Sequence, residues 1–150
     1  MSVQRTGGRV LLLDPGNRLL LIHERLEDGS THWLTPGGGV EGHEHPRDAA
    51  RREAMEETGI AIALAADAEP VLTTRRDWSW AGVDYDQVDH FFVARVPAGT
   101  QVTPRGLTAV EQQTLIETRW WSPAELHATD AVLLPLELAD VLDRVLGAGA

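Results

Sequence analysis

The 150-residue chain contains no cysteine. Disulfides, cysteine-ligated zinc sites, iron–sulfur clusters and thiol nucleophiles are therefore excluded, and the lack of thiols favours a reducing compartment. Positive charge is also scarce, since 13 Lys and Arg stand against 23 Asp and Glu, a net charge of −10. This charge disfavours direct cationic binding of a nucleic-acid polymer. A polyanionic substrate would need a cation as intermediary.

Long apolar runs are missing as well. The longest wholly apolar stretch, residues 60–66, is far shorter than the roughly 20 residues that a membrane-spanning helix needs. The first nine residues contain Arg5 and Arg9 but no apolar core of a secretion signal. We therefore expect a cytoplasmic protein without membrane contact. The length and the 43% hydrophobic content suit one domain over residues 1–150.

Hydrophobic periodicity and turn residues predict strands interleaved with helices. The predicted strands cover residues 10–13 and 19–22, joined as a hairpin, then 60–64, 71–74, 88–96 and 119–121, with a loop over 97–107. The first predicted helix covers 46–58, with Pro46 in its first turn and Gly59 as its left-handed cap. A second helix is expected to begin at Ser122-Pro123, and a last one to follow Pro135 and end at Gly147.

The helix predicted over 46–58 carries an unusual acidic face. Glu53, Glu56 and Glu57 are spaced i, i+3 and i+4, so their side chains project from one side of the helix. Like charges at this spacing repel by roughly 0.2–0.5 kcal/mol. A solvated surface is the ordinary interpretation of such a face. The alternative is a platform for a divalent cation, because Mg²⁺ prefers carboxylate, water and phosphate oxygens.

The residues around this acidic face decide between a solvated surface and a cation-binding site. Gly38 is followed after five residues by Glu44, and after seven more by Arg52-Glu53-Ala54-Met55-Glu56-Glu57-Thr58-Gly59-Ile60. This segment resembles the Nudix box, Gly-x5-Glu-x7-Arg-Glu-U-x-Glu-Glu-x-Gly-U with U apolar, at every specified position. At ordinary residue usage such a match arises by chance less than about once in a million chains. We therefore identify the chain as similar to the Nudix hydrolases.

The resemblance implies a fold and a reaction. The expected fold is an α/β/α sandwich, a mixed curved sheet with the box helix on one side and the C-terminal helix on the other. The expected activity is Mg²⁺-dependent pyrophosphohydrolysis, with Mn²⁺ as a second candidate metal, of a small nucleotide substrate in which a nucleoside diphosphate is linked to another moiety. Water attacks phosphorus in such reactions. The competing hypothesis is a Nudix-fold module that binds a nucleotide without hydrolysing it, which the intact set of box glutamates disfavours.

The resemblance also implies roles for residues. Glu53, Glu56 and Glu57 are the expected metal ligands, and Gly38 allows the backbone to approach the metal. Arg52 can pair with Glu56 or Glu44 and orient the glutamates, while Glu44 itself is better suited to capping the helix than to binding metal. The general base is a box glutamate in some members and a late-loop glutamate in others. The candidates are therefore Glu53, Glu57 and Glu111, with Glu117 as the runner-up.

Residues outside the box supply weaker candidates for substrate binding. The cationic candidates are Arg25, expected to follow the second strand and point toward the glycine loop, and Arg75 and Arg76, expected just after another strand. The ordinary interpretation of each of these arginines is surface charge. Trp78 and Trp80 share one side of a strand and suit stacking on a nucleobase, or else a core or homodimer interface.

Two other groups of polar residues only weakly suggest a metal site. His43 and His45 lack a third ligand for zinc. Asp84, Asp86 and Asp89 lack the glycine and the terminal glutamate of a calcium loop, so we expect them at a solvated hairpin tip.

Overall fold

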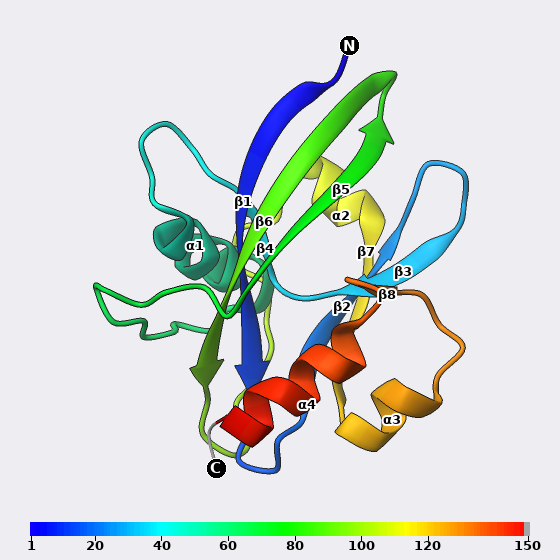
Figure 1. The fold of residues 1–150 in the computed structure, drawn as a ribbon. Helices are drawn as coiled ribbons and strands as arrows, with labels where there is room; N and C mark the ends of the chain where they lie inside the picture. The colour runs from blue at the N-terminus through cyan, green and yellow to red at the C-terminus, as the bar shows by residue number, and fades with distance from the viewer. Residues whose placement is uncertain (149–150) are drawn as a thin grey trace.

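The computed structural model describes residues 1–148. Four strands precede the first helix, and helices and strands alternate one by one only after β6 (Figure 1). The strands are β1 (Val3–Leu13), β2 (Leu19–Arg25), β3 (Thr31–Leu34), β4 (Gly37–Gly39), β5 (Leu72–Trp80), β6 (Val83–Arg95), β7 (Leu115–Trp121) and β8 (Leu133–Leu134). The helices are α1 (Pro46–Thr58), α2 (Ala109–Thr114), α3 (Pro123–Ala128) and α4 (Leu138–Ala148).

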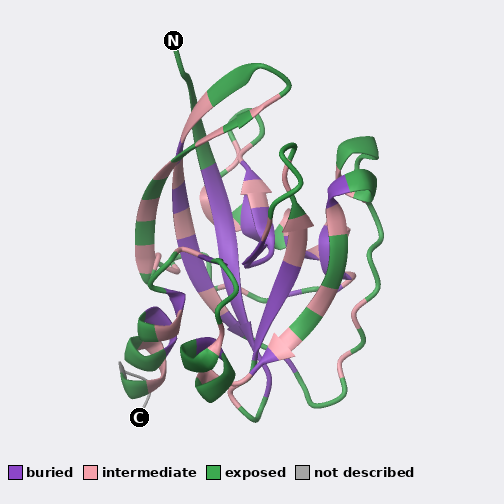
Figure 2. Ribbon diagram, turned by 90° about the vertical axis from the view of Figure 1, so that its right-hand side faces the viewer, coloured by how far each residue is buried: buried purple, intermediate pink, exposed green. Residues whose placement is uncertain are grey.

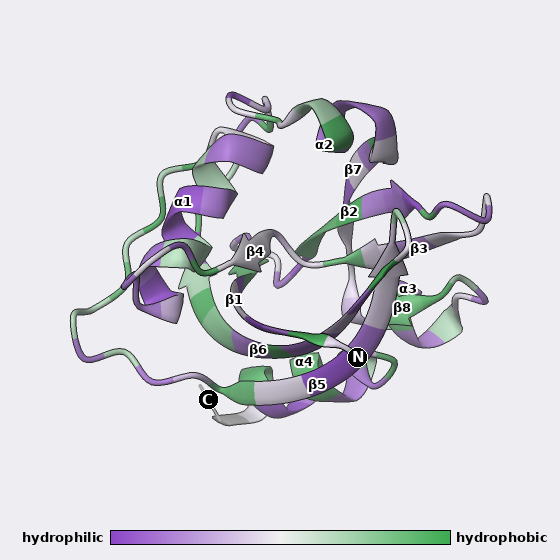
Figure 3. Cartoon of the chain, turned by 90° about the horizontal axis from the view of Figure 1, so that it is seen from above, coloured by the Kyte–Doolittle hydropathy of each residue, from purple (hydrophilic) through white to green (hydrophobic). Residues whose placement is uncertain are grey.

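Strand β1 organises the mixed sheet, whose main order is β5-β6-β1-β2-β3-β8. It pairs in parallel with β6 along its whole length, from Val3 opposite Tyr85 to Leu13 opposite Arg95. On its other edge it pairs with β4 near its middle and with β2 only where Leu13 meets Leu19. β1 and β2 therefore diverge. Seen from above, the sheet is strongly curved (Figure 3).

The two faces of β1 enter two separate cores, and the buried residues follow the middle of the sheet in Figure 2. Val10 and Leu12 pack with α1, while Leu11 and Leu13 pack with α4. Helix α1 lies so close to β1 that a Cβ at Gly8 would overlap the carbonyl oxygen of Pro46. The expected layers, with α1 and the C-terminal helix on opposite sides of a mixed sheet, are confirmed.

Several local predictions are corrected. Residues 60–64 form no strand; Ile60 and Ile62 are buried in the α1-side core without joining a ladder. The strands predicted at 10–13, 19–22, 71–74, 88–96 and 119–121 are longer. In β1, β2, β5 and β6 the added residues are mostly polar and hide the apolar pattern, whereas β7 adds the apolar Leu115 and Ile116 as well. Helix α4 continues through Gly147, so that glycine does not end it.

The hairpin of β1 and β2, the loop over 97–107 and the helix after Ser122 are confirmed. None of the helices within residues 1–148 has the length and hydrophobicity needed to span a membrane.

Candidate active site

Local signals at both ends determine the span of helix α1. The His45 side chain accepts a hydrogen bond from the Arg47 N–H at 3.0 Å, and Pro46 occupies the first turn. At the other end Gly59 has a φ of 73°, a left-handed conformation in which its N–H reaches the carbonyl oxygen of Met55. This span buries Glu57 and leaves Glu53 and Glu56 half-buried. The three glutamates therefore share one edge of the helix.

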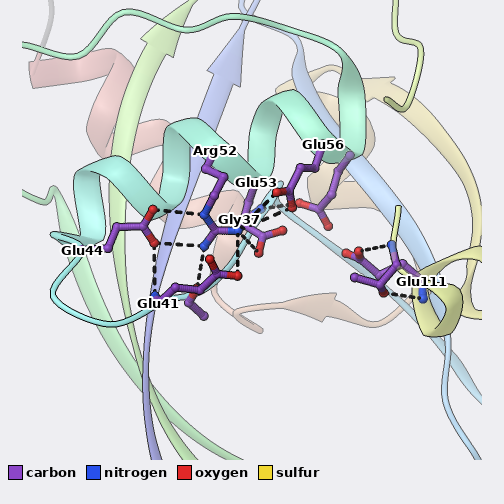
Figure 4. A network of polar contacts seen from close by, with 10 residues as sticks. Gly37, Glu41, Glu44, Arg52, Glu53, Glu56 and Glu111 are labelled. Atoms are coloured by element: carbon purple, nitrogen blue, oxygen red, sulfur yellow. Dashed lines mark hydrogen bonds and ion pairs between the residues drawn. The ribbon is translucent and has the colours of Figure 1, made fainter. Parts of the chain in front are cut away.

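Arg52 binds the carboxylates on both sides of it (Figure 4). It donates to both carboxylate oxygens of Glu44, each at 3.0 Å, and to the carbonyl oxygen of Gly39 at 2.9 Å. Its Nη1 donates to Glu53 Oε1 at 3.1 Å and lies 3.5 Å from Glu56. Arg52 thus contacts both partners that the sequence suggested. Glu44 forms this ion pair instead of capping the helix, because His45 is the cap.

Glu53, Glu57 and Glu111 converge on one point, each offering a carboxylate oxygen within 4.8 Å of the others. Glu57 Oε1 accepts the Gly37 N–H at 2.8 Å, and Glu111 Oε1 accepts the Thr108 N–H at 3.0 Å. Glu53 Oε1 is the oxygen bound by Arg52. Within residues 1–148, the Oε2 atom of each of the three carboxylates accepts no hydrogen bond from the protein.

The electrostatics of this cluster suit a bound cation. Burial, and then the charges of Glu111 and Glu56, raise the pKa of Glu53 to about 7. Burial and the Glu53 charge raise the pKa of Glu57 well above its ordinary value. Crowded carboxylates protonate in this way unless a positive charge joins them. Three oxygens with no protein donor are also the ligand type that a hard divalent cation takes.

The three carboxylates lie in one wall of a cavity of about 600 Å³. The glycines of β4 form the neighbouring wall, and Gly38 lies directly against Glu53, since a Cβ there would be 2.5 Å from Glu53 Oε1. The remaining lining includes residues of β1, β5 and β6, together with residues of β2, β3 and the α2 segment. The cavity therefore occupies the opening where β1 and β2 diverge.

A buried polar layer lines the cavity beyond the acidic cluster. Asp89 is 1% exposed and accepts from Arg9 at 3.2 Å, from Gln87 at 2.6 Å and, more distantly, from Arg76 at 3.5 Å. Burial alone would raise the pKa of Asp89, but Arg9 and its other partners hold it below the ordinary value. Two guanidinium groups therefore share one buried carboxylate beside the cavity.

Aromatic side chains line the same cavity. Trp78 and Tyr85 stack with ring centroids 4.2 Å apart, and the Trp78 N–H donates to Gln87 at 2.8 Å. The Arg5 guanidinium lies 5.6 Å from the Trp78 ring centroid and directly against Gly39. Arg5 therefore reaches from the aromatic pair to the glycine strand. Trp80 also lines the cavity, on the same side of β5 as Trp78.

Some predicted residues lie elsewhere. Arg25 is exposed at the end of β2, not beyond it, and the set of residues that line the cavity does not include it. Arg75 and Arg76 lie inside β5 rather than after it; Arg75 points outward to Asp86 at 2.8 Å, while Arg76 faces the cavity. Glu117 is exposed on β7, away from the cluster.

Three further predictions concern the aspartates and histidines. Asp84 and Asp86 lie near the β5–β6 turn as expected, but Asp89 is not at a solvated tip, because it is buried beside Arg9. His43 is exposed, and His45 serves as the cap of α1.

Sequence reasoning missed Arg5, Arg9, Tyr85, Gln87 and Thr108. The first four alternate along β1 and β6, with every second side chain facing the cavity. In the sequence, such polar and aromatic residues at every second position look like the solvent-facing side of an ordinary strand, so they do not indicate a cavity. For Thr108 a signal exists, since Thr108-x-x-Glu111 has the form of a capping box.

Comparisons with known proteins agree on one family. A family model described as the NUDIX domain matches residues 4–142. The RNA pyrophosphohydrolase of Roseobacter denitrificans is 34% identical over 85 residues, which are 57% of this chain and 51% of that protein. Nudix hydrolase 25 of Arabidopsis thaliana is 28% identical over 127 residues, 78% of this chain and 71% of that one.

A MutT NUDIX hydrolase from Burkholderia pseudomallei superposes with a TM-score of 0.68 at 23% identity, covering 96% of this chain and 99% of that one. That likeness shows the fold. The alignment with the Roseobacter protein reaches only about half of that protein's length.

Proposed function

Because the chain belongs to the Nudix hydrolase family, we propose that it is a Mg²⁺-dependent pyrophosphohydrolase that cleaves a nucleoside diphosphate linked to another moiety. The observation that carries this proposal is the convergence of Glu53, Glu57 and Glu111 in the wall of a cavity large enough for a nucleotide. Their shared environment and their free oxygens support a metal-assisted reaction at this point of the cavity.

The proposed metal ligands are Glu53, Glu56 and Glu57, with Gly38 leaving space beside them. Glu56 is close enough to Glu53 to raise its pKa, although it also faces Arg52. A bound Mg²⁺ or Mn²⁺ would neutralise the pyrophosphate charge as bonds to phosphorus change. Arg52 acts as a positioning residue in this proposal, because it orients Glu53 and Glu44 and does not face the substrate side of the cluster.

We assign the general base to Glu111, with Glu53 and Glu57 as the alternatives. A base must lie within hydrogen-bond reach of the attacking water. Glu111 comes from α2, on the far side of the cluster from α1, so its carboxylate can face a water that the other two glutamates border. Its Oε2 atom has no protein donor within residues 1–148, which leaves it available to accept the proton.

The far part of the cavity suits the nucleoside. Trp78 offers a ring for a base to stack on, and Arg76 and Arg5 offer guanidinium donors for phosphate or carbonyl oxygens. Arg25 and Arg75 are left out of this proposed site because they lie outside the cavity. The net charge of −10 favours a small nucleotide over a nucleic-acid polymer.

A substrate screen tests the proposal. Purified protein is incubated with Mg²⁺ or Mn²⁺ and nucleoside triphosphates, oxidised nucleotides, ADP-ribose, nucleotide sugars or dinucleoside polyphosphates, and chromatography identifies the product pair. We expect one class to be cleaved at a pyrophosphate bond and the activity to vanish with EDTA. Binding of a nucleotide without turnover of any compound would contradict the proposal and favour a sensing module.

A matched pair of variants locates the activity. Glu57→Gln removes a buried charge and should lower kcat by several orders of magnitude, because metal charge stabilisation is worth several kcal/mol. Glu69→Gln makes the same change at an exposed residue outside the cavity and should leave kcat unchanged. Equal activity of the two variants would remove Glu57 from the metal site.

A further inference from the structure

Glu111 has two structural roles at once. It is the third residue of helix α2, where its Oε1 accepts the Thr108 N–H at 3.0 Å while its own N–H donates to Thr108 Oγ1 at 3.1 Å. This reciprocal pair is a capping box, which normally serves only to begin a helix. The same carboxylate also supplies the third oxygen of the cluster with Glu53 and Glu57.

The chain has a second capping box, at the start of α3, and comparing it with the box at α2 shows that the position of Glu111 beside other acids is not needed for capping. At the start of α3 the Ser122 N–H donates to Glu125 Oε1 at 2.9 Å, and the Glu125 N–H donates to Ser122 Oγ at 3.1 Å. The geometry is the same, but Glu125 is exposed and its other partner is Arg119. Capping therefore does not require the carboxylate to meet other acids. At α2 the capped carboxylate meets two of them, and its charge raises the pKa of both.

Little else holds Glu111 in place. Helix α2 has six residues, and only Thr114 among them is buried. The loop before it is tied to α1, because the N–H groups of Arg105 and Gly106 both donate to the Glu56 carbonyl oxygen. This segment is therefore anchored to α1 two residues before Thr108, whose N–H donates to Glu111 Oε1.

We propose that Thr108 is a positioning residue, whose backbone N–H holds Glu111 Oε1 so that the Oε2 atom faces the reaction centre. This inference rests on the proposed function, in which Glu111 contacts the attacking water. The hydrogen bond removes the freedom of a long side chain on a short exposed helix. A general base displaced by about 1 Å loses on the order of 100-fold in rate.

Two substitutions separate the charge of Glu111 from its position. Glu111→Gln keeps an oxygen that accepts the Thr108 N–H but loses the charge. Thr108→Pro keeps the charge and removes the N–H, and the Thr108 φ of −67° suits a proline ring. Thr108→Ala removes only the hydroxyl, while Thr108→Ser keeps both groups.

We expect Thr108→Pro to lower kcat by roughly 10- to 100-fold, the usual effect of removing a group that orients a metal-site residue, with little change in KM. The double variant with Glu111→Gln should be no slower than Glu111→Gln alone, because the bond then has no base to position. Thr108→Ala should cause a smaller loss, and Thr108→Ser should restore wild-type kcat. Titration of the protein with Mn²⁺ alone, followed by electron paramagnetic resonance, should show weaker binding in Glu111→Gln, because the lost charge lies within 4.8 Å of the proposed ligands Glu53 and Glu57, and wild-type binding in Thr108→Pro, which keeps that charge.

Ser122→Ala is the matched control, because it weakens the equivalent box at α3 and should leave kcat and Mn²⁺ affinity unchanged. Wild-type kcat in Thr108→Pro together with an impaired Glu111→Gln would overturn the inference. So would losses that multiply in the double variant. If Thr108→Pro does not fold, replacing the Leu107–Thr108 amide by an ester removes the same N–H without adding a ring, and the same double comparison then decides. Wild-type activity of Glu111→Gln would instead refute the role of Glu111 in the proposed function, a different result.

Discussion

Replacing Gly38 by alanine should damage the metal site without damaging the fold. The Gly38 backbone needs no positive φ, unlike Gly37 at 151°, so alanine fits its conformation. The added Cβ would lie 2.5 Å from Glu53 Oε1 and 2.6 Å from Glu53 Cδ. An unstrained carbon–oxygen contact needs about 3.3 Å. The Glu53 carboxylate must therefore move by nearly 1 Å, away from the position in which Arg52 holds it.

The expected magnitude follows from that displacement. A shift of about 1 Å in a reacting or ligating group lowers the rate on the order of 100-fold. The free energy of unfolding should stay level or rise by up to about 1 kcal/mol, because alanine reduces the freedom of the unfolded chain and Glu53 is a flexible side chain that can turn aside. Measurements of kcat, Mn²⁺ affinity and the urea midpoint on one preparation separate the two effects.

Gly16→Ala is the control for this substitution. Its Cβ would meet only Asp14 Oδ1, at an ordinary 3.5 Å, so kcat and metal affinity should match the wild type. Wild-type kcat and Mn²⁺ affinity in Gly38→Ala would show that the Glu53 carboxylate is not a ligand in this position. A large loss of stability in Gly38→Ala would show that the contact is with something less mobile than a side chain.

Three other perturbations have expected outcomes. Asp89→Ala leaves the buried Arg9 without its carboxylate and should lower the free energy of unfolding by about 3–5 kcal/mol in urea denaturation. The N–H and guanidinium of Arg18 outweigh burial and hold the pKa of Asp14 below its ordinary value. The stabilisation by Asp14 is therefore present above about pH 4 and is lost as pH falls through the lower pKa of the folded state. In Asp14→Asn the melting temperature should fall less steeply as the pH is lowered below about 4. Trp78→Ala should raise KM roughly 5- to 150-fold and leave kcat unchanged, from a stacking energy of about 1–3 kcal/mol, whereas Trp78→Phe should restore KM.

Local signals made the box helix predictable to the residue. Pro46 and Gly59 mark its ends by their backbone preferences, and the i, i+3, i+4 spacing of its glutamates follows from helix geometry alone. The same holds for the helix after Ser122, where a capping box and a proline coincide. These features depend only on residues within one turn of each other, so the sequence alone is sufficient to place them.

The remainder of the site depends on distant pairing. Asp89 contacts Arg9 because β6 lies parallel to β1, and the local sequence of neither strand predicts this ion pair. Arg75 faces the solvent and Arg76 faces the cavity. Because the residues that flank them in β5 are also polar, the hydrophobic pattern cannot show which of the two side chains points inward. The sequence likewise shows that Glu111 follows a loop, but its closeness to Glu53 depends on the tertiary fold.

The parallel pairing of β1 with β6 also bears on how quickly the chain can fold. Every pair in that ladder joins residues about 80 positions apart, such as Val3 with Tyr85. Closing so long a segment consumes chain entropy before any of the ladder's hydrogen bonds can compensate for it. Helix α1 and the β5–β6 hairpin are local and can form early, but β1 cannot be completed until residue 95 has been synthesised. Until then the edge of β1 that faces β6 has no partner strand, and such an open edge can pair with another molecule.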